Sequence, residues 1–192
     1  MKLTITHNDL IPLFLNNLST VGWKGSYDVH QNKLTLYSES IMSLNDYLTK
    51  NKSMSYDNVE QMILHLGNQM ILLSENGLGL LFFSTVDDII ILDNHFCFIS
   101  NLNNVVPINN KEQLTLNYPL KMDGFLSPEL ENVTTLPINV SITSSYYSLA
   151  LLCIKCLGID FLNFDPIMNT RMYFFLQRCL ETDPSKRYFL YL

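Results

Sequence analysis

The segment formed by residues 146–157 constrains the fold more than any other part of this sequence. It is apolar on nearly every side when it is projected as a helix. A helix of that kind has no face to present to water, so other elements must enclose it. The sequence therefore predicts a central buried helix, around which the rest of the chain packs.

Two further helices have clear beginnings. Ser43 precedes a short helix with a capping-box-like start, and Ser55 precedes apolar residues at helical spacing over residues 59–73. Gly77 and Gly79 then end this longer helix, which we expect over residues 56–74. A last amphipathic helix is predicted at 172–180, where Asp183 and Pro184 stop it.

Strand signals are shorter. Residues 34–37 alternate like a strand, and residues 89–92 and 96–99 form a hairpin around Asp93, Asn94 and His95. The Asn-rich residues 101–125 are predicted to be irregular loop. Residues 10–18 could line a short amphipathic helix, and residues 22–25, which include Trp23, are predicted to form a turn.

Composition limits the classes of function. The chain has 192 residues, enough for one domain or slightly more, and a net charge of −6 with no basic run. Nucleic-acid surfaces need clustered Lys and Arg, so no nucleic-acid partner is expected. The apolar runs are too short to span a bilayer, and the first residues lack the apolar core of a signal peptide. We therefore expect an intracellular, cytoplasmic protein.

Cys153 and Cys156 form a C-x-x-C pair that could serve as a redox or metal site. With no second pair and no nearby His, two buried thiols on an apolar helix are the favoured interpretation. His65, Asp87, Asp88, Asp93 and His95 could in principle form a metal or acid–base cluster. Their spacing matches no catalytic motif, so we expect no catalytic, cofactor-binding or metal-binding residue.

Two motifs resemble the C-terminal half of the eukaryotic protein kinases. The first motif, Ser127-Pro128-Glu129, comes before the apolar helix of residues 146–157. The second motif, Asp183-Pro184-Ser185-Lys186-Arg187, follows the last predicted helix, at 172–180. The order of elements from residue 34 onward also resembles the kinase C-lobe. The resemblance implies an α+β, mostly helical, C-lobe-like domain over residues 34–192. Residues 1–33 would then be a vestigial N-lobe or a partner-contact segment, because the N-lobe is reduced or absent.

The resemblance also implies a buried ion pair between Glu129 and Arg187. Arg offers a planar fork that matches a carboxylate, and the pair would tie the end of the activation segment to the last helices. Pro128, Asp183 and Pro184 belong to the same structural motifs.

The chemistry of the family is missing at the matching positions. Leu81, Phe82 and Phe83 stand where kinases have His-Arg-Asp, so Phe83 replaces the catalytic base. Asp88 stands at the position of the metal-binding Asn. Where kinases have Asp-Phe-Gly, the chain has Ser100-Asn101-Leu102, or Asn101-Leu102-Asn103 in the next register, and neither supplies a carboxylate. Ser145 stands at the position of the Asp that holds the catalytic loop from beneath. Before residue 34 there is no phosphate-binding glycine loop, and Lys2, Lys24 and Lys33 do not lie in a strand that resembles Val-Ala-Ile-Lys.

The sequence therefore favours a catalytically inactive pseudokinase that binds a protein partner, as a decoy or regulator of a true kinase. Truncated viral kinase-like proteins are similar to this plan, which would place the protein in the host cytoplasm. The alternative is a structural or assembly subunit of a larger complex, in which residues 1–33 contact another chain.

Overall fold

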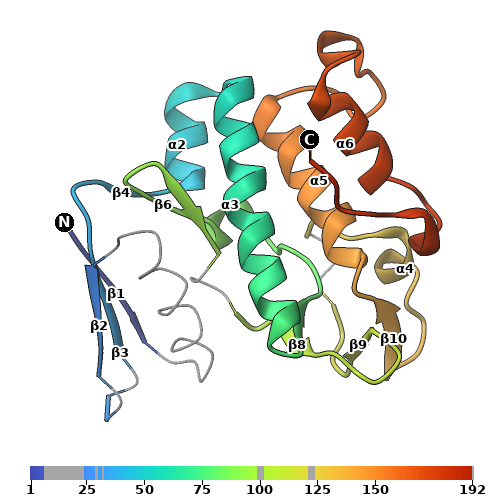
Figure 1. Ribbon diagram of the computed structural model, residues 1–192, viewed down its shortest axis with the longest axis horizontal. Coiled ribbons are helices and arrows are strands. Elements are labelled where there is room, and N and C mark those ends of the chain that lie inside the picture. The colour runs from blue at the N-terminus through green and yellow to red at the C-terminus, as the bar shows by residue number, and fades with distance from the viewer. Residues whose placement is uncertain (7–23, 29, 32, 99–101, 121–123, 192) are drawn as a thin grey trace.

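Helices and small antiparallel sheets share the molecule. The computed structural model describes residues 1–6, 24–28, 30–31, 33–98, 102–120 and 124–191 (Figure 1). Of these described residues, 39% are helical and 22% lie in strands. The expectation of a mostly helical protein is therefore wrong. The chain is α+β, because short strands also form in segments that the sequence pattern did not predict to be strands.

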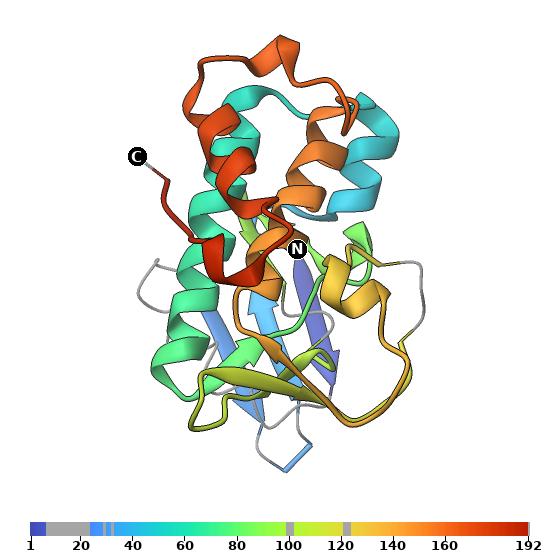
Figure 2. The same cartoon turned by 90° about the vertical axis from the view of Figure 1, so that its right-hand side faces the viewer.

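The apolar segment forms α5 (Ser144–Leu157), which is largely buried and ends at Gly158 in the left-handed region, with φ 67°. It packs against α3 (Tyr56–Glu75) and α6 (Arg171–Cys179) (Figures 1 and 2). The described residues also form a shorter helix, α2 (Leu44–Asn51). The prediction of a central buried helix is confirmed.

The helix starts follow their capping residues. The Ser43 hydroxyl accepts the backbone N–H of Asp46 at 3.0 Å, and the Ser55 hydroxyl accepts that of Asn58 at 3.3 Å. These contacts satisfy N–H groups that lack an intrahelical partner. The two predicted helix beginnings are confirmed.

The N-terminal sheet contains β1 (Lys2–Thr6), β2 (Lys24–Asp28) and β3 (Lys33–Tyr37), in the antiparallel order β1-β3-β2. Lys24 and Gly25 lie in a strand, so the turn predicted at 22–25 is wrong for these two residues. The predicted helix at 10–18 and Trp23 lie outside the described residues.

A second sheet has the order β4-β6-β7, from β4 (Ile41–Ser43), β6 (Ile90–Leu92) and β7 (His95–Cys97). The predicted hairpin is confirmed, but its turn contains only Asp93 and Asn94, with φ of 47° and 70°. Positive φ at both central positions gives a tight turn that suits the twist of the strands. His95 therefore belongs to the strand.

Within the described part of residues 101–125, where the Asn content suggested an irregular loop, two short segments form strands. β8 (Val105–Pro107) pairs with β5 (Leu78–Leu80), and β9 (Gln113–Leu116) pairs with β10 (Ile138–Ser141). Alternation explains β9, since Leu114 and Leu116 are buried while Gln113 and Thr115 are not. The remaining short elements are α4 (Pro128–Glu131), η1 (Val86–Asp88), η2 (Asp165–Ile167) and η3 (Pro184–Lys186).

Candidate functional site

Leu81, Phe82 and Phe83, which follow β5, are fully apolar and buried. Their exposed fractions are 0%, 5% and 1%. The Phe83 ring packs edge-on against Phe98, with ring centroids 5.7 Å apart. These side chains can neither accept a proton nor coordinate a metal ion, so the segment is part of the hydrophobic core.

The backbone of this segment is held by other parts of the chain. The Leu81 carbonyl accepts the Ser144 hydroxyl at 3.2 Å, and the Phe83 N–H donates to the Ser148 hydroxyl at 2.8 Å. On the other side, the Asn104 amide donates to the Phe82 carbonyl at 3.1 Å. Buried backbone groups need such partners. The segment is therefore anchored on two sides.

Ser145, which the resemblance places at the position of the kinase Asp, does not hold this segment in the described contacts: its hydroxyl donates to the Ile142 carbonyl at 2.8 Å. The neighbouring hydroxyls of Ser144 and Ser148 connect α5 to the segment.

Asp88 closes the loop that follows. Its carboxylate accepts the backbone N–H groups of Ser84 at 2.6 Å and Thr85 at 3.0 Å, and the side chain is 7% exposed. Of the positions matched to Asp-Phe-Gly, residues 100 and 101 lie outside the described residues, and Leu102 is buried. Within the described ranges, no three His, Cys, Asp or Glu side chains cluster as a metal would need. Asp88 thus serves as a cap inside its own loop.

The structure brings together the two residues that the kinase resemblance pairs. The Arg187 guanidinium donates to both Glu129 carboxylate oxygens, at 2.6 and 2.8 Å. It also donates to the carbonyls of Glu181 at 2.5 Å and Thr182 at 3.0 Å, and it lies over the Tyr147 ring at 4.9 Å. Arg187 is 3% exposed. A buried charge with this many partners fixes the chain that follows α6 against α4 and α5.

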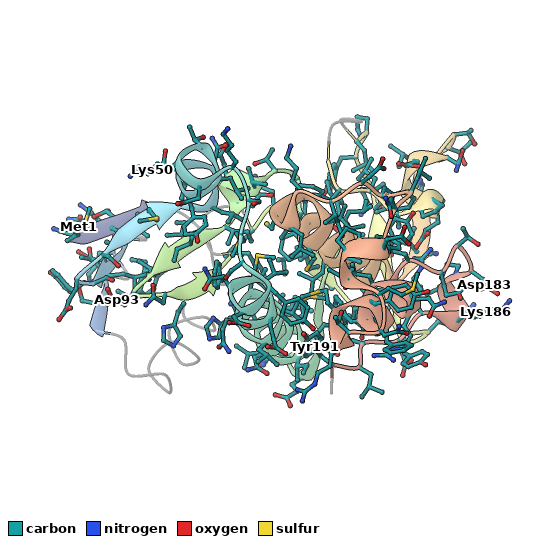
Figure 3. The ribbon with its side chains drawn as sticks, turned by 90° about the horizontal axis from the view of Figure 1, so that it is seen from above. Met1, Lys50, Asp93, Asp183, Lys186 and Tyr191 are labelled. Carbon is teal, nitrogen blue, oxygen red and sulfur yellow. The ribbon has the colours of Figure 1, made fainter. Side chains whose placement is uncertain are left out.

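The other motif residues shape the ends of short elements. Pro128 opens α4, and Asp183 caps η3 by accepting the Ser185 N–H at 3.0 Å and hydroxyl at 2.7 Å. These two bonds from Ser185 lower the Asp183 pKa. The Pro184 carbonyl accepts the Thr143 hydroxyl at 3.0 Å, next to the start of α5. Figure 3 shows Asp183 and Lys186 at one end of the molecule, and Met1 and Asp93 at the other.

The C-x-x-C pair lies within the core. Cys153 and Cys156 are both fully buried and free. Burial raises the pKa of Cys156 to about 12 and that of Cys153 well above its usual value. Metal binding and thiol exchange both use the thiolate, which these surroundings disfavour. The pair therefore contributes packing.

Of the polar cluster considered from sequence, the two histidines lie against each other, and His95 Nδ1 also lies 3.2 Å from the Asp93 carbonyl oxygen. His65 of α3 stacks on His95 of β7 with centroids 4.6 Å apart, and its Nδ1 accepts the Phe96 N–H at 3.3 Å. Asp93 instead accepts the Ser40 N–H at 2.7 Å. Burial, and then the charge of His95, lower the His65 pKa.

Sequence reasoning missed Ser148, Asn104 and Gln69 as anchors. Gln69 lies in α3, where its amide donates to the Phe96 carbonyl at 2.8 Å and accepts the Phe98 N–H at 3.2 Å. A polar residue within an apolar helical face was the available signal for Gln69 and Ser148. Asn104 had no such signal among its many Asn neighbours.

Comparisons with known proteins add no family. No protein-family model matches the sequence, and no curated protein is significantly similar to it. Across the described residues, no helix is both long and apolar enough for a membrane crossing.

Proposed function

We propose that this protein is a catalytically inactive relative of protein kinases that acts by binding another protein, as a decoy or regulator of an active kinase. The observation that carries the proposal is the buried segment of Leu81, Phe82 and Phe83. The hydrogen bonds from α5 that hold this segment resemble those that support a kinase catalytic loop. Apolar core side chains stand where a kinase has its reactive groups.

The supporting contacts connect distant motifs. The Ser127 hydroxyl, from the first kinase-like motif, lies 2.8 Å from the Ser144 hydroxyl, which in turn donates to the Leu81 carbonyl. Glu129, two residues further on, holds Arg187 of the second motif. One network thus links both motifs to the altered segment. Such a network stabilises a shape without supplying a base or a metal ligand for phosphoryl transfer.

An exposed apolar surface supports protein binding. We define the apolar ridge as Phe161, Leu162, Met168 and Phe174, which are 45%, 88%, 52% and 45% exposed. The ridge lies on α6 and on the connection that precedes it, at the top of Figure 1. Ring contacts join its two ends, since Phe164 lies 6.4 Å from Phe161 and 6.5 Å from Tyr173, which contacts Phe174 at 5.3 Å. Grouped apolar side chains of this kind mark protein-binding surfaces.

Nucleotide titration tests the loss of catalysis. We expect no rise in melting temperature when ATP is added with or without Mg²⁺, while an active kinase measured in parallel is stabilised. A ligand that binds only the folded state raises the melting temperature by mass action. A saturable, Mg²⁺-dependent rise would contradict the proposal.

Affinity capture tests binding through the ridge. The wild-type protein, a Phe161→Ser/Leu162→Asp variant and a Leu64→Asp control are immobilised and exposed to extract from the expressing cell. Leu64 is an exposed apolar residue of α3, 41% accessible. We expect the wild type and the control to retain a kinase, detected by phosphotransfer activity in the eluate, and the ridge variant to lose it. Equal kinase recovery with all three proteins would reject the ridge as the binding surface.

A further inference from the structure

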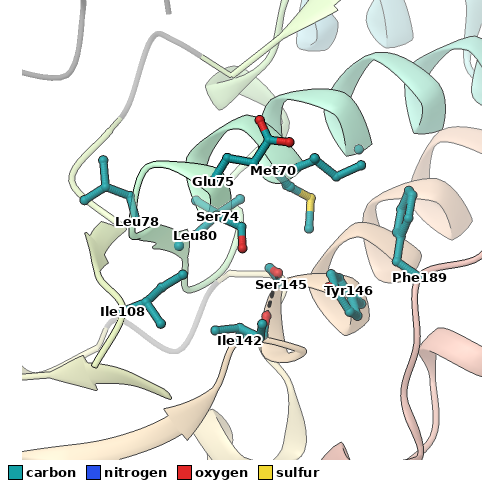
Figure 4. Close-up of a pocket in the computed structure, with 13 residues that line it drawn as sticks. Met70, Ser74, Glu75, Leu78, Leu80, Ile108, Ile142, Ser145, Tyr146 and Phe189 are labelled. Atoms are coloured by element: carbon teal, nitrogen blue, oxygen red, sulfur yellow. Dashed lines mark hydrogen bonds between the residues drawn. The ribbon is translucent and has the colours of Figure 1, made fainter. Parts of the chain in front are cut away.

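A cavity of about 300 Å³ lies between the C-terminal half of α3, β5 and the start of α5 (Figure 4). Its walls are mainly apolar, formed by Met70, Leu78, Leu80, Ile108 and Phe189. A volume of this size is at the small end of the range for small-molecule sites. The cavity can therefore hold a compact apolar body.

Four polar side chains line this cavity: Ser74, Glu75, Ser145 and Tyr146. Ser145 is 4% exposed, and its hydroxyl already donates to the Ile142 carbonyl at 2.8 Å. The hydroxyls of serine and tyrosine can donate or accept, so they favour no sign of charge. Glu75 is exposed at the rim and brings the one carboxylate among the lining residues, which favours a cationic head group.

The end of α3 adds to the negative potential. Glu75 is the last residue of this helix, and its last turn contains no basic residue. The C-terminal end of a helix carries a partial negative charge, which favours a cation. No Lys, Arg or His is among the residues that line the cavity. The rim is thus electronegative while the interior is apolar.

We propose that this cavity binds a small amphiphilic amine, with its apolar chain between α3 and α5 and its ammonium group at Glu75. The site is separate from the apolar ridge, so it goes beyond the proposed binding of a protein partner. Failure of one proposal leaves the other standing.

The C-terminal segment completes one wall of the site. Phe189 packs on Gly67 of α3, where an added Cβ would lie 2.4 Å from the Phe189 ring. The ring also contacts Tyr146 and Phe175, at centroid distances of 5.7 and 5.6 Å. Arg178 fixes the neighbouring Leu190 carbonyl at 2.6 Å. The chain after α6 therefore contributes one wall of the cavity, through Phe189, and the other walls come from the middle of the sequence.

The test uses n-octylamine, 1-octanol and octanoate, which share a chain and differ in head group. Each is titrated into the full chain at pH 7 with ¹³C-methyl methionine labels, and the Met70 signal gives the dissociation constant. Met62, fully buried elsewhere in the core, reports any global change. We expect octylamine to bind about threefold more tightly than octanol, as for one partly solvated ion pair, and octanoate to bind more weakly than either.

Variants locate the site. Glu75→Gln should remove the advantage of octylamine over octanol, whereas Asp57→Asn, at the opposite end of α3, should retain it. Ser74→Phe, at the rim, should block all three ligands, and Asn68→Phe, on the same helix but outside the cavity, should not. An unresponsive Met70 signal, equal binding of amine and alcohol, or a preference for octanoate would overturn the proposal.

Discussion

Two buried polar contacts hold the C-terminal part of this molecule by different chemistry. At one, Arg187 and Glu129 form a charged pair that joins the chain after α6 to α4. At the other, the neutral hydroxyls of Ser144 and Ser148 hold the apolar segment around Phe83 to α5. Both join residues that are more than fifty positions apart in the sequence.

The difference lies in what remains when one partner is removed. A charge left unpaired in a buried site carries a large desolvation penalty, so removing either member of the pair alone is strongly destabilising. Removing the Ser148 hydroxyl leaves the Phe83 N–H unpaired, and removing that of Ser144 leaves the Leu81 carbonyl and the Ser127 hydroxyl without it; these groups are neutral, so the cost is lower. The comparison explains how hydroxyls can hold the segment while the distant motif depends on its full ion pair.

The largest effect is expected from breaking the charged pair. Glu129→Ala should lower the free energy of unfolding by about 3 kcal/mol, at the lower end of the range for buried pairs. The lower end applies because the Glu129 side chain is 19% exposed, so water can partly replace it beside Arg187. Urea unfolding at pH 7 measures the change.

A double variant separates two contributions to this loss of stability: the attraction between Glu129 and Arg187, and the cost of leaving one charge unpaired in a buried site. Glu129→Leu/Arg187→Met should be more stable than Glu129→Ala, because it leaves no unpaired charge in the core. If the double variant were less stable than the single one, attraction within the pair would dominate and the comparison would be wrong.

The neutral anchor should show an intermediate effect. Ser148→Ala leaves the buried Phe83 N–H without its partner, which should cost about 1–2 kcal/mol in free energy of unfolding. Ser74→Ala serves as the control, since Ser74 is exposed and its loss should change stability by less than about 0.5 kcal/mol. Equal effects of the two substitutions in urea unfolding would show that the segment does not depend on Ser148.

These two contacts also show which features of the structure could be predicted from the sequence and which could not. Helix α3 was predictable because its apolar residues follow the helical period and Ser55 precedes it as a cap, and α5 because it is a continuous apolar run of helical length. The β9 strand was missed because its alternation is only four residues long and lies among Asn residues. The meeting of Glu129 and Arg187 followed from motif resemblance. Ser148 could not be identified as an anchor, because its partner is a backbone group 65 positions away.

The smallest effect on stability is expected at His65, whose neutral imidazole becomes charged in acid. His65 accepts the Phe96 N–H through Nδ1, so protonation of that nitrogen breaks the bond and places a charge beside His95. Because burial lowers the His65 pKa in the folded protein, its stabilising contribution is complete above pH 6.5. That contribution is lost as the pH falls from 6.5 through the lower folded pKa.

Urea unfolding between pH 8 and pH 5 tests this conversion, with His65→Gln as the control that cannot titrate. We expect the wild type to lose about 0.5 kcal/mol more than the variant over this range, the lower end for one hydrogen bond. The difference between the two proteins should develop below pH 6.5. Other titrating groups contribute equally to both proteins, so they do not add to this difference. Parallel curves would show that His65 stays neutral or keeps its bond, and that the histidine stack behaves like the serine anchors at every pH.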